Sequence, residues 1–421
     1  MDKFIINGGK SLNGRIKISG AKNSALAIMP ATILADGDNL LRNIPEVNDI
    51  YTMKKLMTHI GSDIEFENHT LKINNDNIDC FTAPYEHVKK MRASVYVLGP
   101  LLAKFGRAKV SMPGGCAWGP RPINLHLEAM KKLGAEIDLD GGYIVAKAKK
   151  LHGAKLHFDV SSVGATGNAL MASVLAKGTT VIYNAAIEPE ITLLAEHLKL
   201  MGAKIDGIGT KTLTIEGVDS LSGKEITNIG DRIECGTLLI ASAMTKGKVE
   251  VEYSHPEHLE TVIWKLEETG LDISVNEDMI TVNAENFIPN PVDVKTAVYP
   301  GFPTDMQAQW IAYMTQAEGE STVTDTIYLD RFKHVPELNR LGANIKVINN
   351  SANVKGPQKL KGAKVMSTDL RASASLVLGG LVAEGETEVL RIYHLDRGYQ
   401  HIEEKLKKLG AEIERIDTKE Y

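Results

Sequence analysis

The feature that most constrains this chain is an internal repeat of about seventy residues. Segments such as KKLGAEIDLD, NRLGANIKVI and KKLGAEIERI each join the charged end of a helix to a glycine and then to the alternating residues of a strand. A glycine at that place suits the left-handed residue that ends many helices. Six copies span the chain, and their glycines are Gly61, Gly134, Gly202, Gly270, Gly342 and Gly410. The repeat therefore organises the whole fold.

A second helix recurs in phase with the first. Each copy has a polar start, a mostly apolar helix of small residues and a closing glycine, as in SSVGATGNALMASVLAKG. Such a helix must be buried, whereas the helices before the LGAEI-type segments carry Lys and Glu on one face and are expected outside. Three units closing around three buried helices would make one globule, and six would make two. The alternative is an open solenoid, whose repeats are usually shorter, about 20 to 50 residues.

Composition narrows the class of protein. The net charge of -5 argues against a general nucleic-acid binder. Three cysteines without paired spacing suit the reducing cytoplasm, and His255 and His258, the nearest approach to a metal-binding pair, lack a third ligand. No apolar run reaches the roughly 18 residues of a membrane span, and polar residues interrupt the N-terminal segment where a signal peptide needs an apolar core. We expect a soluble cytoplasmic protein without nucleic-acid, membrane or metal partners.

Charged and polar residues begin the six buried helices. Equivalent repeats place equivalent helix ends on one side of a globule, and helix N-termini favour anions through their unsatisfied N–H groups and dipole. Lysine and arginine at these places predict an anion-binding surface, with pairing to local carboxylates as the alternative for each residue. The six positions are Lys22, Arg92, Ser162, Arg232, Asp305 and Arg371.

The segment PGGCAWGPRP sets a lone cysteine, Cys116, in flexible surroundings. Gly114 and Gly115 permit positive φ and close backbone approach, so this loop can change shape. A nearby guanidinium, here Arg121, favours the thiolate, and cysteine then serves as acid, base or nucleophile. Packing is the alternative, and the other two cysteines, Cys80 and Cys235, are interpreted as packing residues.

Six motifs spread over the chain carry a family resemblance: GAKNSAL, PGGCAWGPRPINLH, FPTDMQAQ, RFKHVPEL, DLRASASLV and DRGYQHIEEKL. Together they resemble the UDP-N-acetylglucosamine 1-carboxyvinyltransferases, a family of enolpyruvyl transferases. The resemblance implies an α/β fold of two inside-out α/β barrel domains with three repeats each, in agreement with the six units. The expected domains are residues 22–229, which carry the cysteine loop, and residues 1–21 together with 230–421.

The resemblance also implies the reaction. The enolpyruvyl group of phosphoenolpyruvate passes to the 3′-hydroxyl of UDP-N-acetylglucosamine by addition and elimination, releasing phosphate and opening peptidoglycan synthesis, with no metal or organic cofactor. The residues that it places in catalysis are Cys116, Asp305, Lys22, Arg397 and Asp369. Those expected to bind phosphoenolpyruvate are Lys22, Asn23, Arg121, Arg371 and Arg397. Those expected to bind the nucleotide sugar are Arg92, Arg121, Pro122, Ile123, Asn124, Leu125, Ser162, Val163, Gly164, Asp305 and Ile327.

Two roles stay open by resemblance. Asp305 meets the attacking hydroxyl either as general base or as a positioning group. Cys116 protonates the methylene of phosphoenolpyruvate or assists product release, and in the family the epoxide antibiotic fosfomycin alkylates this position. The chain departs from the family at Asn124, where Asp is common, and at Trp118, where an aliphatic residue is expected.

Two other functions compete with this one. The shikimate-pathway enolpyruvyl transferase has the same architecture and uses the same donor, but its opening motif differs from GAKN and we expect no loop cysteine in it. A non-catalytic nucleotide-sugar sensor built from the same repeats belongs to another class of protein. The joint presence of Lys22, Cys116, Asp305 and Arg397 favours the enzyme.

Overall fold

The computed structural model describes residues 2–89, 91–112 and 123–417. Its contacts divide the chain into a continuous unit, Gly20–Ile229, and a split unit, Met1–Ser19 with Gly230–Tyr421. Within the described residues each unit contains three four-stranded sheets. All six sheets share one topology: the first strand pairs parallel with the second, and the second, third and fourth pair antiparallel. The repeat read from the sequence is therefore a structural repeat.

In the continuous unit, a short strand from the end of the segment completes the sheet formed near its beginning. Strand β16, at the end of the unit, pairs with β4 near its beginning, so the first repeat is closed by the last residues. The sheets run β16 (Glu225–Thr227), β4 (Asp38–Arg42), β6 (Thr70–Asn74), β5 (Asp63–Glu67); β7 (Thr82–Ala83), β8 (Arg107–Ser111), β10 (Tyr143–Lys147), β9 (Glu136–Asp140); and β11 (Lys155–His157), β12 (Thr179–Tyr183), β14 (Thr212–Glu216), β13 (Lys204–Asp206). A two-stranded pair adds β15 (Leu221–Ser222) and β3 (Ala35–Asp36).

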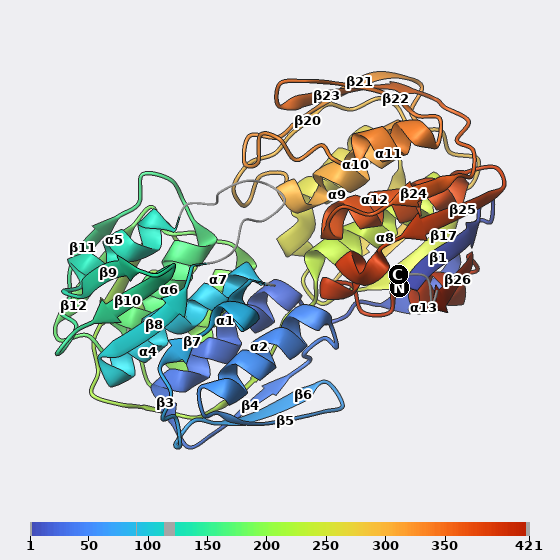
Figure 1. Cartoon of the computed structure of the whole chain (residues 1–421). Helices are drawn as coiled ribbons and strands as arrows, with labels where there is room; N and C mark the ends of the chain where they lie inside the picture. Colours follow the sequence, from blue (N-terminus) through green and yellow to red (C-terminus); the bar gives the residue numbers. More distant parts are fainter. Residues whose placement is uncertain (1, 90, 113–122, 418–421) are drawn as a thin grey trace. The chain divides into compact units, whose positions relative to one another are not determined.

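In the split unit, the N-terminal strands complete sheets formed by the last two hundred residues or so. Strand β1 lies between β25 and β26, near the C-terminus (Figure 1). The sheets run β24 (Lys364–Met366), β25 (Glu386–Leu390), β1 (Asp2–Asn7), β26 (Glu412–Asp417); β2 (Asn13–Lys17), β17 (Lys248–Glu252), β19 (Met279–Asn283), β18 (Asp272–Asn276); and β20 (Val294–Lys295), β21 (Gly319–Thr324), β23 (Ser351–Gly356), β22 (Asn344–Ile348). This pairing explains why the unit needs both ends of the chain.

The mostly apolar helices lie in the cores, as predicted. In the continuous unit they are α1 (Lys22–Ala31), α4 (Leu98–Phe105), which follows the 3₁₀ turn η2 (Arg92–Val97), and α6 (Val163–Ser173). Small residues let these helices approach closely: a Cβ added at Gly99 of α4 would lie 2.6 Å from the carbonyl oxygen of Asn168 in α6. A side chain at that position would push the two helices apart.

The split unit buries three equivalent helices. They are α8 (Arg232–Met244), α10 (Gln307–Met314), which follows the 3₁₀ turn η4 (Thr304–Met306), and α12 (Leu370–Val382). A buried polar group joins two of them, since the Gln309 amide donates to the Thr237 hydroxyl and to the Tyr399 hydroxyl, both at 3.2 Å. Cys235, a residue of α8, is fully buried, and burial raises the pKa of its thiol well above the usual value. Its interpretation as a packing residue is confirmed.

The second set of helices is amphipathic, with one exception. These helices end at the six repeat glycines, each of which has positive φ as predicted. In helix α7, however, residues on most of its surface are buried, including His197, so the prediction that this whole set lies outside is wrong for α7. The helices of this second set are α2 (Asn48–His59), α5 (Asn124–Lys132), α7 (Pro189–Leu200), α9 (Glu260–Glu268), α11 (Val335–Arg340) and α13 (Ile402–Lys408). The remaining short helices are α3 (Tyr85–Val88), η1 (Thr32–Leu34), η3 (Pro256–Leu259) and η5 (Ile392–Arg397). Across the described residues, none of the helices has the length and apolar character of a membrane span.

Replacing His197 by leucine should stabilise the continuous unit, and more at pH 5.5 than at pH 7.5. Burial lowers the pKa of His197 to about 4, so below about pH 6.5 the unfolded chain binds a proton that the folded chain does not. The folded state thereby loses about 1 kcal/mol through this residue at pH 5.5. Thermal unfolding midpoints at both pH values measure the effect. Replacing the exposed His157 by glutamine is the control, and an equal acid-induced drop in the His197 variant and the wild type would contradict the account.

Candidate functional site

The most distinctive polar group of the split unit is a carboxylate held by two arginines. Arg331 donates through Nη1 to Asp305 Oδ1 at 2.8 Å, and Arg371 donates through Nη2 to Asp305 Oδ2 at 2.8 Å. The arginine side chains are 8% and 4% exposed, whereas the Asp305 side chain is 27% exposed. The two arginines thus contact the carboxylate on its buried side, and the rest of its surface is exposed to solvent.

The charge state of Asp305 follows from this arrangement. Burial alone would raise the pKa of its carboxyl group, but the charges of Arg371 and Arg331 outweigh burial and hold the pKa well below its ordinary value. Asp305 lies in the turn η4, whose capping residue is Pro303, so the carboxylate does not serve as a simple helix cap. At neutral pH it is an ionised hydrogen-bond acceptor at the start of a buried helix.

Three more predicted residues, Asp369, Arg397 and Ile327, belong to the same unit as Asp305. Asp369 caps α12, because its Oδ1 accepts from the backbone N–H of Arg371 at 2.9 Å and of Ala372 at 3.2 Å. Burial lowers the pKa of His394, the charge of Arg397 lowers it further, and Asp369 opposes the shift, so both charged groups act on this imidazole. The structure therefore gathers Asp305, Arg371, Asp369 and Arg397 within one unit. Ile327, which is 36% exposed, follows strand β21 in that same unit.

In the continuous unit, Lys22 begins α1 and is nearly buried. Its ammonium lies 3.2 Å from Oδ2 of Asp49, a buried residue of α2. An ammonium has three N–H donors and this contact uses one of them, so donors remain for a second anion. Asn23, the next residue, is exposed.

A second group of predicted residues surrounds His126. The imidazole Nδ1 accepts from the Asn168 amide at 2.9 Å, and a Cβ added at Gly164 would lie 3.0 Å from the ring. Burial, and then the charge of Arg92, lower the pKa of His126 to about 4, so this imidazole is neutral near pH 7. The starts of η2, α5 and α6 therefore meet at one buried ring.

The structure describes five more predicted residues of this unit, all of them near Gly164 or His126 in sequence. Ser162 caps α6 by accepting from the backbone N–H of Ala165 at 3.3 Å, and Val163 is 36% exposed. Asn124 begins α5 and is exposed, Ile123 is buried and Leu125 is half-buried. Three predicted residues, Cys116, Arg121 and Pro122, lie outside the described part of the chain, as does Trp118.

Sequence reasoning assigned no role to Arg331 or Asp49. Arg331 opens the RFKHVPEL motif, which was used for the resemblance, and Asp49 lies in an ordinary amphipathic helix. Each is linked to its partner across 26 or 27 positions of sequence. Only the packing of separate elements could reveal these two ion pairs.

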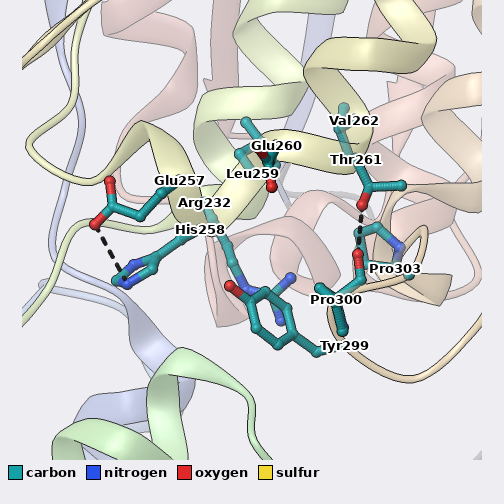
Figure 2. Close-up of a pocket in the computed structure, with 11 residues that line it drawn as sticks. Arg232, Glu257, His258, Leu259, Glu260, Thr261, Val262, Tyr299, Pro300 and Pro303 are labelled. Carbon is teal, nitrogen blue, oxygen red and sulfur yellow. Dashed lines mark hydrogen bonds and ion pairs between the residues drawn. The ribbon is translucent and has the colours of Figure 1, made fainter. Parts of the chain in front are cut away.

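Figure 2 shows a small hollow in the split unit. Arg232, the first residue of α8, lies at one side with its guanidinium 5.5 Å from the centre of the Tyr299 ring. Pro303, which precedes the turn that carries Asp305, also lines it. The hollow therefore lies beside the starts of two buried segments, α8 and the turn η4 that leads into α10. The Thr261 hydroxyl donates to the Pro300 carbonyl at its rim.

One side-chain group in the described ranges has the spacing of metal ligands: the ligand atoms of His255, Glu257 and His258 lie within 4.8 Å of one another. Glu257 thus supplies the third candidate ligand that the sequence appeared to lack. The two imidazole rings stack, however, with centres 4.8 Å apart and planes 19° apart. A metal ion lies close to the plane of each imidazole that binds it, so two nearly parallel rings do not converge on one ion. We assign no metal to this group.

Comparison with known proteins identifies the family to which this fold belongs. The chain belongs to the family of EPSP synthase (3-phosphoshikimate 1-carboxyvinyltransferase), whose model matches residues 6–406. The crystal structure of the enolpyruvyl transferase NikO from Streptomyces tendae matches over 99% of both chains, with a TM-score of 0.91 and 25% identity. An EPSP synthase from Acinetobacter baumannii matches over 99% of this chain and 100% of its own, with a TM-score of 0.77 and 17% identity. The predicted enolpyruvyl transferase fold is confirmed.

Relatives of higher identity share one name. The UDP-N-acetylglucosamine 1-carboxyvinyltransferase of Chloroherpeton thalassium is 58% identical over 100% of this chain and 99% of its own length. That of Chlorobium limicola is 57% identical over 100% of both. The resemblance drawn from the six motifs is confirmed.

Replacing Arg331 by methionine should destabilise the split unit by about 3 kcal/mol, because it breaks a largely buried ion pair. The folded pKa of Asp305 lies below the unfolded value, so its stabilising effect is present above about pH 4 and is lost only as the pH falls through the folded pKa. The loss should therefore be the same from pH 5 to pH 8, as measured by thermal unfolding. Replacing Arg340, whose guanidinium makes an exposed contact with the Lys364 carbonyl, by methionine is the control. A loss that fades toward pH 5 would show that Asp305 titrates there.

Proposed function

We propose that this protein transfers the enolpyruvyl group of phosphoenolpyruvate to the 3′-hydroxyl of UDP-N-acetylglucosamine and releases phosphate, the step that commits a bacterium to peptidoglycan synthesis. The observation that carries the proposal is the 58% identity over the whole chain to a relative of that name. The proposal places the reaction in the bacterial cytoplasm and requires no cofactor. The charged groups at the helix starts give it a mechanism.

We assign Asp305 to the acceptor hydroxyl. An ionised carboxylate accepts a hydrogen bond from the 3′-hydroxyl and orients its oxygen toward the electrophilic carbon of phosphoenolpyruvate. Because Arg331 and Arg371 keep the pKa of Asp305 low, the group is a strong positioner and a weak base while both contacts last. Of the two roles left open by the sequence, the substrate-free geometry favours positioning.

Phosphoenolpyruvate carries a phosphate and a carboxylate, so it needs several cations. We assign its binding to Lys22, Asn23, Arg121, Arg371 and Arg397. Guanidinium groups suit this substrate because their planar N–H donors pair with two oxygens at once. Arg371 serves two anions in this scheme, since its Nη2 already holds Asp305. Asp369 is assigned a place near the reacting atoms through the start of α12 that it caps.

We assign the nucleotide sugar to the residues around His126 and to Ile327. The start of α6 offers the backbone N–H groups of Val163 and Gly164, and its dipole favours the negative diphosphate. Arg92 and Arg121 add charge, and Pro122, Ile123, Asn124 and Leu125 form the neighbouring segment. Asn124 keeps an acceptor oxygen but carries no charge, so hydrogen bonding at this position is the function that remains.

The direct test is incubation of the full chain with phosphoenolpyruvate and UDP-N-acetylglucosamine. The expected result is phosphate release together with a nucleotide sugar heavier by one enolpyruvyl group, both followed by mass spectrometry and a phosphate assay. The family model is named for the shikimate-pathway enzyme, so shikimate 3-phosphate is the matched acceptor to compare. Phosphate release with shikimate 3-phosphate and none with the nucleotide sugar would overturn the proposal.

Replacing Cys116 by serine should severely reduce turnover and leave nucleotide-sugar binding largely intact. A serine hydroxyl is a far weaker acid and nucleophile than a cysteine thiol near neutral pH. Steady-state phosphate release and a binding titration with UDP-N-acetylglucosamine measure the two effects. Fosfomycin should add to the wild type at Cys116 and not to the variant. Unchanged turnover in the variant would remove the thiol from the mechanism, and Cys235→Ser is a control for a buried cysteine outside it.

A further inference from the structure

A buried carboxylate with no assigned role, Asp325, organises the segment that carries Ile327. Asp325 follows strand β21 and is fully buried. Its Oδ1 accepts from the backbone N–H groups of Ile327 and Tyr328, both at 2.9 Å, and from the Thr296 hydroxyl at 2.8 Å. One oxygen atom thus fixes the turn on which Ile327 lies.

The other oxygen of Asp325 faces the Asp305 group. Its Oδ2 accepts from the Thr304 hydroxyl at 2.7 Å. The Thr304 hydroxyl has one proton, which it donates in the hydrogen bond to Asp325. The Thr304 oxygen can therefore only accept from its second partner. That partner is Arg331, whose Nη1 lies 3.0 Å from Thr304 Oγ1 and 2.8 Å from Asp305 Oδ1. The direction of every hydrogen bond from Asp325 to Asp305 is therefore determined.

We propose that Asp325 is a positioning residue of the transfer reaction, which through Thr304 and Arg331 sets the place of the Asp305 carboxylate relative to the Ile327 turn. This inference rests on the proposed function, in which Asp305 meets the acceptor hydroxyl and Ile327 contacts the nucleotide. One buried side chain then holds the group that recognises the nucleotide and the group that orients its sugar hydroxyl. A reacting hydroxyl displaced by about 1 Å loses much of the benefit of its orientation.

A purely structural role for Asp325 would account for part of these contacts. A buried carboxylate that accepts two backbone N–H groups stabilises a turn, whatever the protein does. Such a role does not need the Thr304 hydroxyl, which lies between Asp325 Oδ2 and the Arg331 guanidinium. Arg331 also contacts the turn through Tyr328, whose carbonyl accepts from the Arg331 backbone N–H at 3.1 Å and whose ring centre lies 5.4 Å from the guanidinium, but neither contact uses Thr304. The Thr304 link is therefore the place where the two explanations give different results.

Replacing Thr304 by valine removes the link and keeps the shape of the side chain. Since Oδ1 of Asp325 still holds the Ile327 turn, kcat for the transfer should fall by about tenfold or more, the effect of one lost hydrogen bond to a charged group. KM for UDP-N-acetylglucosamine should stay within about twofold. Replacing Asp325 by asparagine, which disturbs both oxygens, should lower kcat and also raise this KM.

The matched control is Thr269→Val. Thr269 is a fully buried threonine of the same unit that bonds the Leu266 carbonyl and the Tyr313 hydroxyl, away from Asp305. This variant should lose thermal stability and keep wild-type kcat and KM. A Thr304→Val enzyme that has lost stability but keeps kcat would overturn the inference and leave the proposed function standing. Failure of the wild type to release phosphate from the two substrates would instead remove the proposed function.

Discussion

One carboxylate, Asp305, holds two largely buried guanidinium groups together. Two buried positive charges are costly, and the ionised Asp305 carboxylate that both arginines contact offsets part of that cost. The same pairing leaves the carboxylate partly exposed and ionised, ready to accept a hydrogen bond. Both the stability of the fold and the proposed chemistry therefore require Asp305 to stay charged.

The fold positions its charged groups at the starts of buried helices. Each unit closes three sheets of identical topology around three mostly apolar helices, so the helix starts are the places where charge reaches the surface of an apolar core. Lys22 and Arg232 are the first residues of α1 and α8, and Arg371 is the second residue of α12. The sixfold repeat thus supplies six similar helix starts, at which different side chains perform different tasks.

Much of this could be predicted from the sequence because the repeat is local and periodic. The buried helices, the repeat glycines and the positions of the charged starts follow from patterns within single repeats. The exposure of α7 was predicted wrongly because the burial of its polar face depends on what packs against it, and His197 is buried there without any signal in its own segment. The roles of Arg331, Asp49 and Asp325 were not predicted either, since each arises from partners that only tertiary packing brings together.

The most direct test of the central claim is the charge state of Asp305 in the substrate-free protein. Carboxyl carbon NMR of the chain labelled in aspartate, with the resonance assigned by its loss in Asp305→Asn, follows that state as the pH is lowered. We predict that the Asp305 resonance stays at the position of an ionised carboxylate from pH 7 to below about pH 4. A titration midpoint at pH 5 or above would contradict it, because the two arginines would then not be holding the charge.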